Sequence, residues 1–339
     1  MQAHPVIRYD VAIQASGRPM NEVLTLLLEL YRGASERPFE EFQEFAIRLV
    51  QPALRFESAR WGAGSLEPDG FKPGLVHLHN EPDESVASWE DVLAQDTIVP
   101  EVLARPGATV SAHVPSRYAG KDQAGIRDYA RKYRHQNILA TAFVAPGRGS
   151  AEWLSFYRGG ADDCFSEPER RACEQLTPHL LQALAINRNL HLGRLRQGQD
   201  GACFAMADPR GRLWHAEPAF LDLLAGEWPG WRAPLLPRRL AESLALRPNE
   251  AYAGKRCRIG AALLGKLLLL KARPRTPVDD LTPRELEIAR AYGSGLSHRE
   301  VAAQFNISPE TVRHHLRAVF GKLGIGDKAE LARFLPPCP

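Results

Sequence analysis

The last quarter of the chain, residues 281–335, constrains the fold most strongly because helix-start signals recur there at short intervals. Four residues that can cap a helix stand at breaks in its apolar pattern: Thr282, Ser297, Ser308 and Asp327. Three of them are followed three residues later by a glutamate, which can return a hydrogen bond to the backbone of the cap. The fourth is followed by Pro309, a residue favoured at the first position of a helix. The segment therefore predicts four short helices.

Only Asn306, Ile307 and Ser308 separate the second predicted helix from the third, which is the spacing of a helix-turn-helix. At about 100° per residue, one stripe of the third helix is apolar and should pack inward: Val312, Leu316, Val319, Phe320 and Leu323. The opposite side should face outward with small residues and hydrogen-bond donors: Glu310, Thr311, Arg313, His314, Arg317 and Ala318. This pattern predicts a helix that can enter the major groove of DNA.

The motifs TPRE, GLSHREVAAQF, SPETVRHHL and KLGI together resemble the LuxR/NarL-type helix-turn-helix domain of bacterial transcription regulators. The resemblance covers about one sixth of the chain and implies an all-α, four-helix domain that binds double-stranded operator DNA as a homodimer and contacts RNA polymerase. It implies base contacts by Arg313, His314 and Arg317. Thr311, Lys322 and Ser308 are candidates for phosphate contacts, which position a protein without reading sequence. A small helical bundle that binds other proteins is the alternative interpretation.

Charge does not by itself indicate DNA binding, because residues 281–335 hold eight Lys and Arg against six Asp and Glu, and the whole chain carries a formal net charge of +3. We expect a cytoplasmic protein without a membrane segment, since the sequence has no apolar run of about twenty residues and no signal-peptide pattern at its start. The five cysteines are scattered without zinc-ligand spacing. The sequence therefore predicts no catalytic residues, no metal site and no cofactor.

The part of the chain before residue 274 predicts an α+β region of two modules. Residues 1–197 alternate amphipathic helices with strands, include a hairpin around 146–149, and end in a long helix from Glu167. This order resembles a GAF-type sensor domain. Residues 198–273 begin with a strand, an Asp-Pro-Arg-Gly turn, a strand and a helix, and resemble a PAS domain, truncated or irregular after Trp228. Residues 274–280 contain two prolines and predict a linker that keeps residues 281–335 apart.

A ligand pocket in the first module would be lined by residues of its strands and inserted helices. The candidates are Trp61, His77, His79, Trp89, Tyr129, Tyr133 and Phe143. An aromatic core explains most of them equally well. His77 and His79 could also share one side of a strand and bind a metal, although surface or core histidines are the simpler interpretation. The Trp, Tyr and Asp-Pro arrangement of acyl-homoserine-lactone sensors is missing, so the resemblance does not assign that ligand.

These patterns support the hypothesis of a one-component, LuxR-type transcription regulator whose N-terminal region responds to a small-molecule effector. In the main alternative, the N-terminal region only dimerises and senses no ligand. A third hypothesis, an enzyme with a regulatory tail, finds no Ser-His-Asp, paired-carboxylate or metal spacing in its favour. Residues 260–267 fit GxxxxGK but lack the Ser or Thr that would bind magnesium, so nucleotide binding is not expected.

Overall fold

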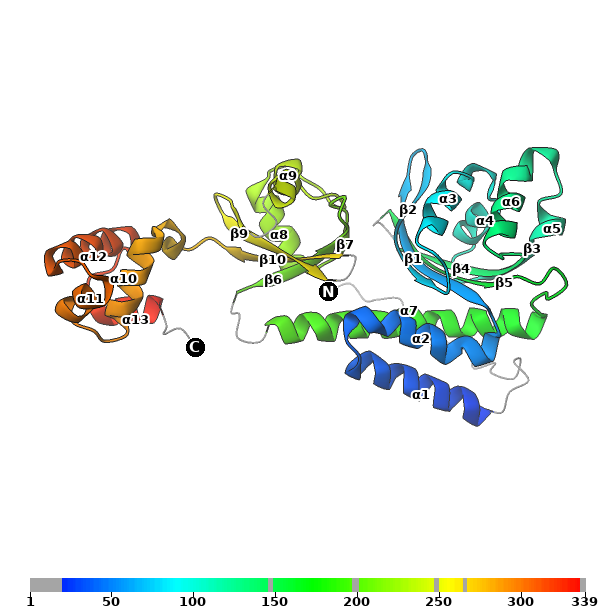
Figure 1. Cartoon of the computed structure of the whole chain (residues 1–339), viewed down its shortest axis with the longest axis horizontal. Helices are drawn as coiled ribbons and strands as arrows, with labels where there is room; N and C mark the ends of the chain where they lie inside the picture. Colours follow the sequence, from blue (N-terminus) through cyan, green and yellow to red (C-terminus); the bar gives the residue numbers. More distant parts are fainter. Residues whose placement is uncertain (1–19, 146–148, 197–200, 247–249, 265–266, 336–339) are drawn as a thin grey trace.

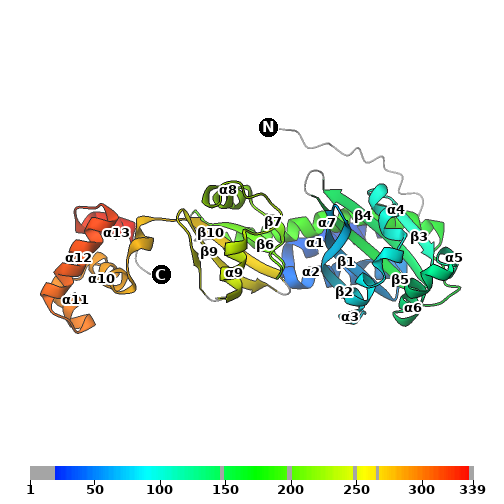
Figure 2. The ribbon, with the colours of Figure 1, turned by 90° about the horizontal axis from the view of Figure 1, so that it is seen from above.

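The computed structural model describes residues 20–145, 149–196, 201–246, 250–264 and 267–335. Figures 1 and 2 show three parts in series: a first unit (residues 20–196), a second unit (201–274) and a helical domain (281–335). The short joint between the last two consists of residues 275–280. The predicted class, an α+β region followed by an all-α domain of four helices, is confirmed.

The first unit is built on one antiparallel sheet with strand order β2-β1-β5-β4-β3. Its strands are β1 (Ser58–Glu67), β2 (Gly70–His79), β3 (Thr109–His113), β4 (Asn137–Ala145) and β5 (Ser150–Arg158). One face is covered by α1 (Met20–Glu36), α2 (Phe39–Leu54) and α7 (Glu167–Arg196). The other face carries α3 (Glu84–Glu90), η2 (Leu93–Gln95), α4 (Ile98–Ala104), α5 (Val114–Arg117), η3 (Lys121–Gln123) and α6 (Ala124–Lys132). The sheet therefore has an apolar core on each face.

The segment from Glu84 to Ala104 contains two separate α-helices, α3 and α4. Helix α3 ends at Glu90, and α4 begins at Ile98 with Pro100 in its first turn. A proline is tolerated there because the first amide groups of a helix have no intrahelical partner. Asp96 provides the missing acceptor at the start of α4, because its side chain accepts hydrogen bonds from the amides of Ile98 (2.8 Å) and Val99 (3.4 Å).

The second unit is also an antiparallel sheet, with strand order β7-β6-β10-β9-β8. Its elements are β6 (Cys203–Ala207), β7 (Leu213–Ala216), α8 (Pro218–Glu227), α9 (Arg238–Leu246), β8 (Tyr252–Ala253), β9 (Cys257–Leu264) and β10 (Leu267–Pro274). The predicted turn between the first two strands is present: Asp208 accepts a hydrogen bond from the amide of Arg212 at 2.9 Å, and Gly211 has a φ of 81°. The resemblance of this unit to a PAS domain stays a prediction.

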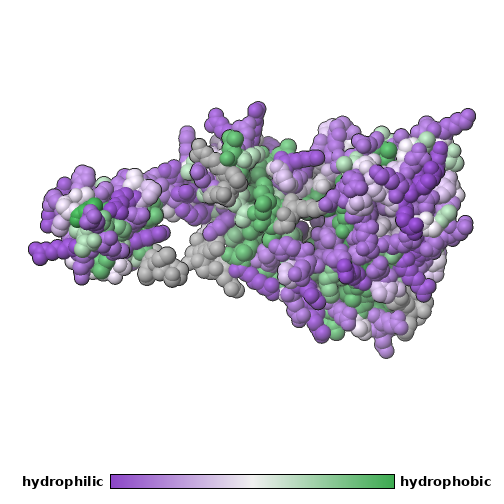
Figure 3. All heavy atoms as spheres, viewed as in Figure 1, coloured by the Kyte–Doolittle hydropathy of each residue, from purple (hydrophilic) through white to green (hydrophobic). Residues whose placement is uncertain are grey.

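The two units pack through an apolar cluster that lies between the sheets. Its buried members are Leu192 of α7, Phe204 and Met206 of β6, and Leu267 of β10. Trp214 and Leu75 pack around them, from β7 and β2 respectively. Figure 3 shows an apolar band on the surface of the second unit. Leu263 of β9, in the same unit, has an exposed side chain.

Residues 274–280, the predicted linker, contain the end of β10 and a 3-10 turn, and the assignment of this segment as a linker stays a prediction. Pro274 ends β10, and Pro277–Asp280 form the 3-10 turn η4. The side chain of Asp279 receives a hydrogen bond from Arg273 at 2.6 Å and lies 3.2 Å from Arg258, both on the second sheet. Val278 packs against the core of the helical domain. Neighbouring prolines did not prevent order because ion pairs and an apolar contact hold both sides of the turn.

The helical domain contains α10 (Pro283–Gly293), α11 (His298–Phe305), α12 (Pro309–Leu323) and α13 (Lys328–Phe334). Each helix begins directly after the predicted cap, whose side chain accepts a hydrogen bond from a backbone amide in the first turn. The turn between α11 and α12 places Asn306 in the left-handed region, with φ 52°. Asparagine adopts this conformation at low cost, so the sequence favours the sharp change of direction.

Asn187 of α7 provides a test of how the helical layer is held together. Its buried amide donates hydrogen bonds to the carbonyl oxygens of Ala34 (3.0 Å) and Arg37 (2.8 Å), at the end of α1. Because Asn187→Ala leaves both carbonyls without this donor, we expect the free energy of unfolding to fall by about 1–3 kcal/mol. Chemical denaturation would measure it. Asn189→Ala, at an exposed position of the same helix, should change stability little, and an equal effect of both variants would contradict the assigned role.

Candidate nucleic-acid interface and ligand cavity

Helix α12 is held in the helical domain by its cap and by one apolar stripe. Ser308 Oγ accepts a hydrogen bond from the amide of Thr311 at 3.0 Å. Four residues of the predicted inward stripe are buried, Val312, Leu316, Val319 and Leu323, and Phe320 is half-buried. They pack on residues of α10, α11 and α13. The predicted helical phase is therefore confirmed.

The opposite side of α12 presents the predicted base-contacting residues. Arg313, His314 and Arg317 are all exposed. Arg313 is paired with Glu310 one turn earlier on the helix. A guanidinium group on an exposed helix can donate two hydrogen bonds to O6 and N7 of guanine in the major groove. Helix α12 can therefore act as a recognition helix.

The predicted phosphate contacts already have partners within the domain. The hydroxyls of Ser308 and Thr311 lie 2.9 Å apart at the start of α12. Lys322 Nζ lies 2.6 Å from an oxygen of Glu285, and the same oxygen accepts a hydrogen bond from the amide of Thr282. The hydrogen bond from Lys322 holds the pKa of Glu285 below its usual value, against the opposing effect of desolvation. Lys322 thus ties α12 to α10, and a phosphate would have to compete for it.

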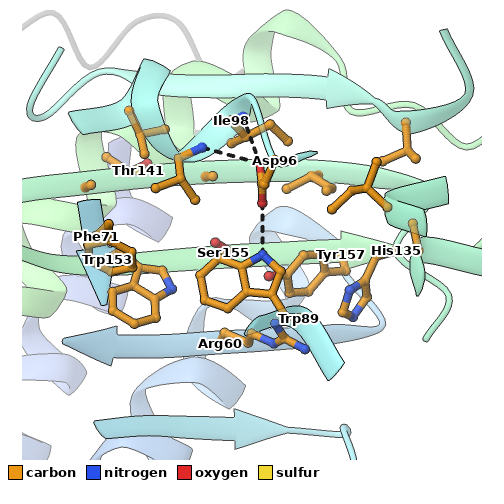
Figure 4. A pocket seen from close by; sticks show the side chains of 18 of the residues that line it. Arg60, Phe71, Trp89, Asp96, Ile98, His135, Thr141, Trp153, Ser155 and Tyr157 are labelled. Carbon is orange, nitrogen blue, oxygen red and sulfur yellow. Dashed lines mark hydrogen bonds between the residues drawn. The ribbon is translucent and has the colours of Figure 1, made fainter. Parts of the chain in front are cut away.

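A small cavity of about 60 Å³ lies in the first unit between the sheet and helices α3 to α6 (Figure 4). Most of its wall is apolar, and it includes the rings of Phe71, Trp89 and Trp153. The rings of Phe71 and Trp153 meet edge to face with their centroids 5.3 Å apart. This volume corresponds to a few water molecules, so a larger guest requires the surrounding side chains or helices to move.

A buried ion pair forms part of the wall of the cavity. Arg60 and Glu81 have side chains that are 2% and 1% exposed, and Arg60 Nη2 lies 2.6 Å from Glu81 Oε2. The same nitrogen donates to the hydroxyl of Tyr129 at 2.5 Å, and the guanidinium lies over the rings of Trp89, Tyr129 and Tyr157. These aromatic faces stabilise a buried cation.

His135 completes this cluster, with its ring stacked on Tyr157 at 3.7 Å and its Nε2 3.2 Å from Glu81 Oε1. Burial lowers the pKa of His135 and outweighs the opposing effect of Glu81. Burial by itself would raise the pKa of Glu81, but His135 and Arg60 together hold it below its usual value. Glu81 is therefore ionised and His135 neutral near pH 7.

Asp96 is the second polar centre of the cavity and is shown with its hydrogen bonds in Figure 4. Besides the amides at the start of α4, it accepts hydrogen bonds from Trp89 Nε1 at 2.9 Å and from the hydroxyl of Tyr118 at 3.0 Å. Burial, together with the charge of Asp96, raises the pKa of Tyr118 to about 12. The carboxylate of Asp96 is thus well supplied with donors.

Of the seven predicted ligand residues, Trp89 and Tyr129 line the cavity. Trp61 packs in the core on the opposite face of the sheet. His77 and His79 each lie 3.1 Å from Glu44 of α2. The other two predicted residues also lie outside it: Tyr133, whose hydroxyl is 2.9 Å from that of Ser88, and Phe143, beside Gly107.

Prediction from sequence missed five functional candidates of the cavity: Arg60, Asp96, Tyr118, His135 and Trp153. One signal was available, because an arginine within the otherwise apolar strand Ser58–Gly64 requires a buried counter-charge. Among the described residues, no group of three or more His, Cys, Asp or Glu side chains is arranged to hold a metal ion. No helix within the described ranges is long and apolar enough to cross a bilayer.

Comparison with known proteins identifies the helical domain. Residues 279–335 match the family "Bacterial regulatory proteins, luxR family". A nitrate/nitrite response regulator protein homolog of Haemophilus influenzae is 42% identical over 59 residues, which are 17% of this chain and 28% of that protein. This chain thus spans about 28% of the length of that relative.

Solved structures of similar proteins include Escherichia coli SdiA, with a TM-score of 0.38 and 15% identity over 92% of this chain and 95% of that chain. The phycoerythrobilin-bound GAF domain of a cyanobacterial phytochrome has a TM-score of 0.34 and 14% identity, covering 51% of this chain and all of that domain. Similarity at this level assigns no ligand to the cavity.

The Arg60–Glu81 pair predicts a measurable loss of stability. Glu81→Gln removes the charge that faces the buried guanidinium, so we expect the free energy of unfolding to fall by about 3–5 kcal/mol at pH 7. Chemical denaturation of this variant and of Glu84→Gln, an exposed neighbour, would measure the difference.

The stability of the protein should also depend on pH, because the pKa values of both Glu81 and His135 are lower in the folded chain than in the unfolded chain. The unfolded chain therefore binds these protons more readily, so the free energy of unfolding falls as the pH drops below about 6.5, and again below about 4.5. Glu81→Gln should flatten the lower part of that profile, and an unchanged profile would contradict the assignment.

Proposed function

We propose that this chain is a one-component transcription regulator, from the premise that residues 279–335 are a LuxR-family domain. The observation that carries the proposal is the outward face of α12, where Arg313, His314 and Arg317 are exposed while the opposite stripe is buried. On this proposal the chain acts in the cytoplasm, binds operator DNA and catalyses no reaction.

The proposed DNA complex is a homodimer, because helix-turn-helix proteins bind two half-sites about one helical turn apart through a molecular two-fold axis. Arg313, His314 and Arg317 would read bases. Ser308, Thr311 and the amino end of α12 would lie at the phosphates, where backbone amides and the helix dipole favour an anion. Lys322 would join them only by exchanging Glu285 for a phosphate. A contact with RNA polymerase completes the proposal.

The signal in this proposal is a small molecule bound in the cavity of the first unit. The wall is largely apolar, Arg60 is paired with Glu81, and Asp96 has donors from Trp89 and Tyr118. A charged ligand would disturb these balanced charges, so we propose an uncharged molecule with an apolar body and a polar end. Its binding would enlarge the cavity and shift the population between two arrangements of the protein.

The alternative remains a DNA-binding dimer whose first unit senses nothing. One observation favours it: the cavity of about 60 Å³ is small compared with the volume of most ligand pockets. The enzyme hypothesis has less support, because the polar residues of the cavity form ion pairs and helix-start contacts without a nucleophile beside a base.

Arg317→Ala tests base reading. After selection of bound sequences from random DNA has supplied an operator, the variant should lose about 1–3 kcal/mol of binding free energy on that operator and less on random DNA. A gel-shift or fluorescence-anisotropy titration at fixed salt would measure both. Arg333→Ala, which removes the same charge from α13, is the matched control. Equal losses on operator and random DNA would remove Arg317 from base reading.

A thermal-shift screen of the full chain against uncharged metabolites tests the cavity. A ligand should raise the melting temperature of the unmodified protein, because it binds only the folded state. Ala140→Leu adds bulk inside the cavity and should abolish that shift, while a cooperative melting transition without compound shows that the variant is folded. A shift that persists in this variant would place the ligand elsewhere, and no shift with any compound would favour the alternative without a ligand.

A further inference from the structure

Three glycines at an irregularity of the first sheet lie in close contact with aromatic rings. The register between β1 and β2 shifts between Gly62 and Gly64. A Cβ atom added to Gly62 would lie 2.2 Å from Trp153, one on Gly64 would lie 2.4 Å from Phe71, and one on Gly74 would lie 2.1 Å from Trp214. Distances this short mean that the rings occupy the space that a Cβ atom would take, so they pack directly against the backbone at these glycines.

Two of these rings belong to the cavity and the third belongs to the second unit. Trp153 and Phe71 line the cavity and contact each other. Trp214, on β7, is part of the apolar cluster between the units, together with Leu192 and Met206. The Cβ atom added to Gly74 would also lie 3.1 Å from the carbonyl oxygen of Ala63, so the ring of Trp214 packs where strands β1 and β2 meet.

An ion pair fixes the second unit to the same stretch of sheet. Glu67, the last residue of β1, accepts a hydrogen bond from Arg212 at 2.6 Å, and their side chains are 35% and 14% exposed. Glu67 also accepts a hydrogen bond from Ser65 at 2.9 Å. Arg212 stands two residues before Trp214, so both contacts reach the irregular end of the β1–β2 hairpin from one short segment.

We propose that this glycine-rich irregularity, residues 62–64 and 74, couples the cavity to the second unit. The coupling rests on the proposed sensing function. A ligand that enlarges the cavity displaces Trp153 and Phe71, and the strands at Gly62 and Gly64 shift with them. The ring of Trp214 then loses its contact with Gly74. Glycine is needed at these positions because any side chain would hold the rings away from the backbone. The movement reaches the helical domain through Asp279, which is bound to Arg258 and Arg273 of the second sheet.

Hydrogen–deuterium exchange of the full chain tests this coupling without a ligand or DNA. Trp153→Phe withdraws part of the ring from Gly62, so amide exchange at residues 213–216 should accelerate about fivefold or more, the lower range of usual coupling strengths. Ile98→Val is the control, since it also removes bulk from the wall of the same cavity, from α4, and its side chain packs on none of the three glycines. It should accelerate exchange in the first unit alone.

The outcome is decisive in each case. Unchanged exchange at 213–216 in Trp153→Phe, or equal acceleration by both variants, overturns the route through the glycines. If Trp153→Phe does not fold, Trp214→Phe provides the reverse test, because coupling is reciprocal: exchange at residues 62–64 and 74–76 should accelerate, and no change there overturns the proposal. A protein that passes this test but binds no compound in the thermal-shift screen has the coupling without the proposed sensing.

Discussion

The first unit depends on the burial of one ion pair, Arg60 with Glu81. Moving two charges out of water costs several kcal/mol per ion, and only close geometry and further hydrogen bonds offset that cost. The surrounding residues meet this demand: Tyr129 accepts a hydrogen bond, three aromatic faces surround the guanidinium, and His135 approaches the free side of the carboxylate. Strand β1, the turn after β2, helix α6 and the start of β4 are thereby held in fixed positions around the cavity.

The same constraint explains why the cavity is small and internally balanced. A pair that must keep water out requires tightly packed neighbours, and Trp89 and Tyr157 serve both the cation and the cavity wall. A ligand that enters the cavity must therefore displace aromatic side chains that also stabilise the guanidinium of Arg60. The ring of Trp153 also packs directly on the backbone of Gly62. Strain introduced in the cavity is thus directed toward the β1–β2 hairpin and the second unit packed on it.

How much could be predicted from sequence depended on how far apart the interacting residues are. The helical domain was predictable because a cap and the residue it binds are three positions apart, and because the phase of α12 follows from one helical period. The cavity was not, since it requires knowing which face of a strand each side chain takes. Arg60 and Trp61 are neighbours in sequence but lie on opposite faces, and only the helices packed on each side decide which face holds the cavity.

The ordering contacts of the joint could not be predicted for the same reason, because Asp279 pairs with Arg258, which is distant in the sequence. That order matters for how the domain can read DNA. Residues 281–335 have nearly balanced charge, with Arg313 paired to Glu310 and Lys322 to Glu285. Few cations are left to release counterions from the phosphates, so one copy should bind weakly. In the proposed DNA complex, affinity would come from two copies on two half-sites, where the second binds at a high effective concentration only if the spacing between the domains is right. The ion pairs of Asp279 with Arg258 and Arg273 would make that spacing depend on the second unit, and on this proposal a small movement near Gly74 changes the occupancy of DNA.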